Sequence, residues 1–188
     1  MLDKHKYKRD GFLLLRSFSG KDEILRVQEE AKDVFRVQLR KQQLDIEDFT
    51  VEAGFNKALY ALFEEDFQQV VNCERQIRHL VSPHRLGTDY RIGDALTALG
   101  VTFPRISHNP VLFSNSRHLA KRRRIPASWN HQDWRNNQGP LDSITMRVPL
   151  VDIDQSLGAL EVIPGSHRWG FSSLKTMDTT ITYRSEYQ

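Results

Sequence analysis

Apolar side chains recur at helical spacing through the first hundred residues. Ser19 opens a capping-box-like spacing to Asp22, and apolar residues follow at three- and four-residue steps, which predicts an amphipathic helix. These apolar residues are Ile24, Val27, Ala31, Val34 and Phe35. A second helix is predicted from about 56 to 81, with an apolar side formed by Leu59, Leu62, Phe63, Phe67, Val70, Val71, Ile77 and Leu80. Pro and Gly in 82–89 are predicted to break it, and a short third helix is predicted to stop at Gly100.

After residue 100 the pattern becomes typical of strands. Residues 143–150, SITMRVPL, alternate: Ile144, Met146, Val148 and Leu150 share one face, and Thr145 and Arg147 share the other. Further strands are predicted over 101–106, 111–115 and 158–164, and the apolar run 11–18 also suits a buried strand. Helices first and strands second indicate an α+β or mainly β fold, in which N-terminal helices partly cover an antiparallel sheet or barrel.

Composition sets limits on domain number and compartment. At 188 residues the chain is long enough for one full core, so we expect a single domain, helical over about 1–100 and β-rich over about 101–188. The lone cysteine, Cys73, excludes an internal disulfide and is predicted to be core, which favours a reducing compartment. No signal peptide and no membrane-length apolar run is evident, so a soluble, cytoplasmic protein is expected.

The candidate chemistry centres on NHQDW, residues 130–134. In a strand, residues two apart point to the same side, so His131 and Asp133 could direct an imidazole nitrogen and a carboxylate oxygen at one point. Two His and one carboxylate on one face of an octahedral ion leave positions open, as in non-haem Fe(II) oxygenases. A pair this short also arises by chance, and His131 taken alone could be an ordinary hydrogen-bonded or surface histidine.

The three tryptophans of the chain lie beside these segments. Trp129 and Trp134 flank the His131–Asp133 pair, and Trp169 follows PGSHR. They are consistent with a lined pocket, and equally with aromatic residues that cap one end of a barrel core.

Two longer blocks carry a family resemblance. HQDWRNNQGPLDSITMRVPLVDID, followed by GALEVIPGSHRWG, resembles the phytanoyl-CoA dioxygenase family of Fe(II)/2-oxoglutarate oxygenases, and the start YKRDGFLLLRSF is also similar. The resemblance implies a double-stranded β-helix core (a jelly roll, cupin-like) with N-terminal helices packed on it. It makes His131 and Asp133 two of three iron ligands, with 2-oxoglutarate as co-substrate and a small organic substrate that is hydroxylated. Retention of Asp133 favours hydroxylation, because related halogenases lack this carboxylate.

The resemblance leaves one ligand to be found. In the family a second His, and then an Arg that pairs with the far carboxylate of 2-oxoglutarate, follow well after the PGSH block. Residues 171–188 contain no His, so the sequence is expected to be an oxygenase without its last strands, as a fragment, a truncated reading frame or a degenerate copy. The expectation is a hydroxylase, active or inactive as it stands, and the alternative is a non-catalytic binding module on the same scaffold. His167 is the only downstream His; it could be the third ligand, or a turn histidine hydrogen-bonded near the pocket.

Other residues complete the predicted site. Asn115 and His118 are candidates for contacting 2-oxoglutarate, as is Thr145, while Trp129, Trp134, Arg147 and His167 are candidates for lining the pocket. The basic run 117–126 could attract an anionic substrate, or could be a solvated loop. A net charge of +3 and the lack of a nucleic-acid motif argue against nucleic acid as a partner. One cysteine also excludes a Cys-based zinc site.

Overall fold

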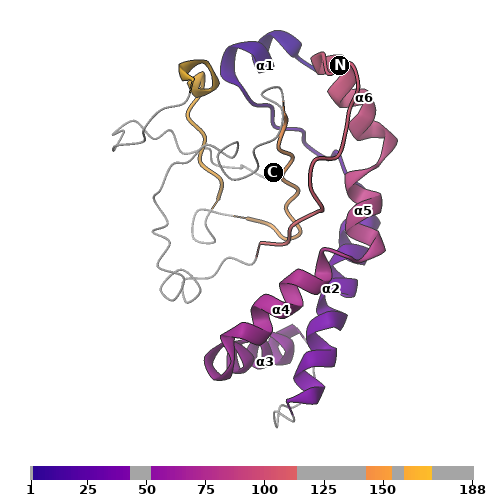
Figure 1. The fold of residues 1–188 in the computed structure, drawn as a ribbon, viewed down its shortest axis with the longest axis vertical. Coiled ribbons are helices and arrows are strands. Elements are labelled where there is room, and N and C mark those ends of the chain that lie inside the picture. The colour runs from indigo at the N-terminus through magenta and orange to yellow at the C-terminus, as the bar shows by residue number, and fades with distance from the viewer. Residues whose placement is uncertain (1, 43–51, 114–142, 154–158, 171–188) are drawn as a thin grey trace. The chain divides into compact units, whose positions relative to one another are not determined.

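The computed structural model describes residues 2–42, 52–113, 143–153 and 159–170, which fall into two compact units (Figure 1). Unit 1 comprises 1–18, 91–107 and 114–188, and unit 2 comprises 19–90 and 108–113. The predicted single domain is not tested by this division.

Unit 2 is built around α2, Lys21–Lys41. Gly20 precedes the helix in an extended conformation, and its N–H donates to the Glu23 carboxylate at 2.6 Å, which fixes the first turn. The predicted cap at Ser19 is therefore wrong by one residue. The apolar face is confirmed, since α2 buries Val27, Ala31, Phe35 and Leu39.

Two further helices replace the single helix predicted from 56 to 81. Helix α3 runs Glu52–Glu65 and α4 runs Phe67–Ile77. The break falls at Asp66, whose carboxylate accepts the N–H of Gln68 at 3.0 Å and so starts a new helix. A side chain that competes for backbone N–H groups thus interrupts an otherwise continuous apolar stripe.

The segment predicted to break the second helix is itself helical. Helix α5 spans Val81–Gly87. Pro83 is tolerated because it lies in the first turn, where backbone N–H groups have no partner within the helix.

The core of unit 2 lies among these helices: α2 contacts α3, α4 and α5, and α3 contacts α4 (Figure 1). Phe35 meets Phe55 edge-on at 6.4 Å between ring centroids, and Phe63 meets Phe67 at 5.4 Å. The largest fully buried side chains are Leu39, Leu62, Ile77 and Cys73, which confirms Cys73 as a core residue.

Unit 1 contains α1, Lys4–Asp10, and nearly all of α6, Tyr90–Leu99. The sequence pattern did not predict α1, although Asp3 caps it by accepting the N–H of Lys6 at 2.8 Å. The predicted stop of α6 is confirmed: Gly100 adopts φ +110°, a backbone conformation that favours glycine. The described residues of this unit also include the 3-10 helix η2, Ser166–Trp169.

The predicted β architecture is contradicted. Among residues 2–42, 52–113, 143–153 and 159–170 none forms a strand, so the α+β or mainly β fold with a jelly-roll core is wrong for the part described. The predicted alternation over 143–150 holds only in part: Ile144, Val148 and Leu150 are half-buried and Thr145 and Arg147 are exposed, but Met146, predicted to share the apolar face, is exposed too. Alternation reports which side faces inward, but a strand also needs a second backbone in register.

Within residues 2–42, 52–113, 143–153 and 159–170, every helix is too short or too polar to cross a bilayer.

Candidate functional site

Most of the predicted site lies outside the described residues. His131, Asp133, Asn115, His118, Trp129 and Trp134 all fall within 114–142. The structure places Thr145 and Arg147 as exposed residues of 143–153, and His167 as an exposed residue of η2. The predicted roles of all these residues in a metal and co-substrate site stay predictions.

Helix η2 lies beside α1 (Figure 1, where η2 is gold and α1 indigo), and its residue His167 lies against the C-terminal end of α1. Its Nε2 is 3.2 Å from the carbonyl oxygen of Lys8. A carbonyl oxygen only accepts, so Nε2 must carry the proton that is shared in this bond. A protonated ring nitrogen has no lone pair to give to a metal.

A second hydrogen bond holds the same turn. The N–H of Gly165 donates to the carbonyl oxygen of Asp10 at 2.8 Å. Gly165 has φ +77°, which allows the chain to turn directly into η2. The PGSH turn therefore binds the end of α1 through one backbone and one side-chain donor.

Gly11 packs directly against the imidazole ring of His167. It ends α1 at φ +84°, and its N–H donates to the carbonyl oxygen of Tyr7 at 2.8 Å. A Cβ added at Gly11 would overlap Nδ1 and Cγ of His167. Sequence reasoning treated Gly11 as the start of a strand; its place after a basic last turn, KYKRD, is the feature that could have identified a helix-ending glycine.

Charged side chains surround the carboxylate of Asp10. Arg9 Nε donates to Oδ1 at 2.7 Å, and Lys6 Nζ donates to Oδ2 at 2.7 Å. The hydrogen bonds from Arg9 and then Lys6 hold the pKa of Asp10 well below its usual value. The Asp10 carboxylate therefore stays ionised at the end of α1, next to the Lys8 and Asp10 carbonyls that bind the PGSH turn.

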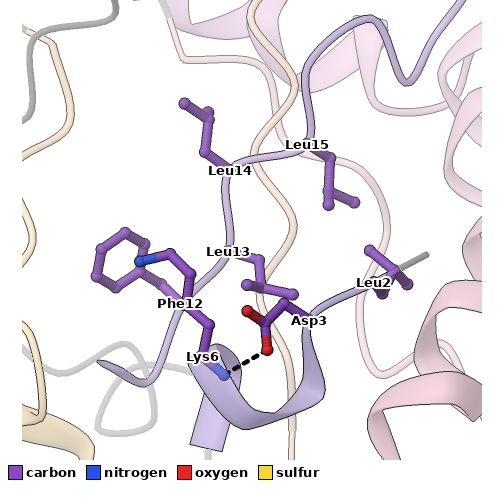
Figure 2. A pocket seen from close by; sticks show the side chains of 7 residues that line it. All are labelled: Leu2, Asp3, Lys6, Phe12, Leu13, Leu14 and Leu15. Carbon is purple, nitrogen blue, oxygen red and sulfur yellow. Dashed lines mark hydrogen bonds between the residues drawn. The ribbon is translucent and has the colours of Figure 1, made fainter. Parts of the chain in front are cut away.

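A pocket of about 260 Å³ lies next to α1 (Figure 2). It is lined by Leu2, Asp3, Lys6, Phe12, Leu13, Leu14 and Leu15. Figure 2 shows the Lys6 side chain beside the Phe12 ring, and Nζ is 5.7 Å from the ring centroid. The pocket is largely apolar, and its lining includes none of the residues predicted from the sequence to line a pocket.

Outside 1, 43–51, 114–142, 154–158 and 171–188, no three His, Cys, Asp or Glu side chains come together to hold an ion. Because both predicted ligands lie within 114–142, their convergence is not tested by this result.

Comparison with known proteins identifies the class. Residues 7–186 match the family model described as phytanoyl-CoA dioxygenase (PhyH), a family of dioxygenase-type enzymes. The chain belongs to the phytanoyl-CoA dioxygenase family, which confirms the resemblance found in its sequence. Neither the curated proteins nor the solved structures contain a match to it.

Proposed function

We propose that this protein hydroxylates a small organic substrate with Fe(II) as cofactor and 2-oxoglutarate as co-substrate. The observation that carries the proposal is the family match over 7–186, which spans the His131–Asp133 pair. One imidazole and one carboxylate are two of the three ligands used by non-haem Fe(II) oxygenases. When bound, iron and 2-oxoglutarate would supply the oxidising chemistry that side chains lack.

The chain's own residues would hold and orient these groups. His131 and Asp133 would bind the iron, and Asn115, His118 and Thr145 would contact 2-oxoglutarate. Trp129 and Trp134 would exclude water from the reacting centre. Roles for the third iron ligand and the 2-oxoglutarate-binding Arg are not assigned to residues of this chain.

An anionic substrate fits the charges near the proposed iron site. Residues 117–126 contain five Lys and Arg side chains and precede His131 closely. Arg147, exposed in 143–153, adds another cation on the side of the segment that also presents Thr145. Clustered positive charge raises the local concentration of an anion and speeds its association.

An anaerobic titration tests the proposal. Fe(II) added to the protein with 2-oxoglutarate should produce the weak visible charge-transfer band of the iron chelate, and no band without either component. Admission of dioxygen should then release succinate. A protein that binds a small anion with iron absent and yields neither band nor succinate would be a binding module, and the proposal would be rejected.

A further inference from the structure

We infer that His167 is a positioning residue, held in a socket at the C-terminal end of α1, and not an iron ligand. The socket is formed by the Lys8 carbonyl and by Gly11, and it is defined by contacts within unit 1 alone. The statement about iron rests on the proposed function, whereas the socket itself does not.

The hydrogen-bond pattern at the end of α1 is the first support. The last four carbonyls of a helix have no partner within the helix and need donors from elsewhere. In α1 the Tyr7 carbonyl accepts a hydrogen bond from the Gly11 N–H, and the Lys8 carbonyl accepts one from His167 Nε2. The Asp10 carbonyl accepts one from the Gly165 N–H. Two of these three donors come from the PGSH turn, so the turn acts as the cap of α1.

The shape of the socket is the second support. Gly11 combines a positive φ with a ring of His167 in the space that a Cβ would fill. Either feature alone favours glycine, and together they leave no room for any other residue unless the imidazole moves. The close approach therefore couples the identity of residue 11 to the position of residue 167.

The socket belongs to a longer connection, which we call the N-terminal strap, residues 2–18. At one end of it Lys4 lies over Gly100, where an added Cβ would come within 3.3 Å of Nζ. At the other end, Arg91 Nη1 donates to the Phe18 carbonyl at 3.2 Å. The strap thus joins α6 to the PGSH turn, and His167 is the side chain through which the turn is held.

The consequence for metal binding follows from the protonation of the ring. In the socket Nε2 carries the proton and faces Lys8, and Nδ1 lies over Gly11. For Nε2 to bind iron, the ring would have to give up the bond to Lys8, and Nδ1 would have to leave the space above Gly11. His167 therefore holds the turn in place of ligating iron.

Hydrogen exchange tests the socket without reference to activity. His167→Ala should speed exchange of the Gly165 amide by about tenfold, which corresponds to about 1.4 kcal/mol of lost local stability. His167→Gln, whose side-chain amide can donate from nearly the same place as Nε2, should restore exchange to within about threefold of the natural chain. Gly11→Ala should resemble His167→Ala. Unchanged exchange in His167→Ala would overturn the socket.

Two further measurements separate positioning from ligation. Nitrogen-resolved NMR of the imidazole should show the proton on Nε2, and Fe(II) affinity should change by less than about threefold in His167→Ala and His167→Gln. Loss of iron binding in both variants, with Gly165 exchange unchanged, would make His167 a ligand. If the natural chain binds no iron, the proposed function fails, while exchange and NMR still decide the socket.

Discussion

Arg91 and Phe18 are joined by two interactions in unit 1. Arg91 Nη1 donates to the Phe18 carbonyl at 3.2 Å, and the guanidinium lies 6.0 Å from the centroid of the Phe18 ring. One side chain of α6 thus fixes both the backbone and the ring at the end of the N-terminal strap. A planar guanidinium is suited to this double role, whereas an ammonium group is not.

Replacement of Arg91 should show this coupling. Arg91→Ala is expected to destabilise the protein by about 1–2 kcal/mol, since it removes a hydrogen bond from a charged donor and a cation–π contact. Arg91→Lys should recover less than half of the loss. Urea unfolding measures the free energy of unfolding of both Arg91 variants. The control is Arg85→Ala, which replaces an exposed residue of α5. Equal stability of the Ala variant and the natural chain would contradict the prediction.

Asp66 is predicted to stabilise the junction of α3 and α4. Its carboxylate accepts from the Gln68 N–H at 3.0 Å and from Gln69 Nε2 at 3.2 Å. Asp66→Ala should cost about 1 kcal/mol, the usual effect of removing an N-cap, and Asp66→Asn should cost only a fraction of that. Denaturant midpoints of the two variants give the comparison. An Asn variant as unstable as the Ala variant would show that charge, not capping, matters there.

The low pKa of Asp10 predicts acid sensitivity. The unfolded chain has the ordinary value of 3.8 and the folded chain a lower one, so the unfolded state takes up the proton first as pH falls. The stabilisation is complete above about pH 4 and is lost as pH falls from 3.8 toward the folded value. Asp10→Asn should flatten the fall of the melting temperature below about pH 4, and the exposed control Asp94→Asn should not.

Cys73 should be a slow thiol. Burial, and then the charge of Glu74, raises the pKa of Cys73 from 9.0 to about 11, and its side chain is almost fully buried. At pH 8 an aromatic disulfide reagent should react at least a hundredfold more slowly with the folded protein than with protein in guanidinium. The contribution of this thiol to stability should be lost as pH rises from 9.0 toward 11. Fast labelling of the folded form would contradict its burial.

The proposed iron ligands give the functional prediction. His131→Ala and Asp133→Ala should each remove the chelate band in the anaerobic titration, because each removes one of the few protein ligands. His79→Ala, an exposed histidine after α4, should leave the band unchanged. Full band intensity in His131→Ala would exclude this residue from the metal site. Addition of a strong chelator to the natural chain should abolish succinate release in the same way.

Sequence patterns predicted features that depend on neighbouring residues better than features that depend on residues far apart in the chain. The apolar face of α2 and the end of α6 at Gly100 follow from spacing and from one glycine, and both are confirmed. The break at Asp66 was missed because the apolar stripe continues across it, while a single carboxylate decides the backbone path. Helix α5 was missed because Pro83 suits a helix only in its first turn.

The site could be predicted only as far as its motif. The His131–Asp133 pair and the family were found from the sequence, and the family is confirmed. The socket that holds His167 could not be predicted, because its partners Lys8 and Gly11 lie far from His167 in the sequence. The strand predictions failed in the described residues because alternation at 143–150 specifies a buried side and not a neighbouring backbone.

The division into two units also has a consequence for synthesis on the ribosome. Unit 2 is almost wholly one uninterrupted stretch, 19–90, so its helices can assemble while later codons are still being read. Unit 1 combines residues that are far apart in the sequence, and the C-terminal end of α1 must wait for the PGSH turn to emerge. Until then the strap can contact α6, but the last carbonyls of α1 lack the donors that the PGSH turn supplies.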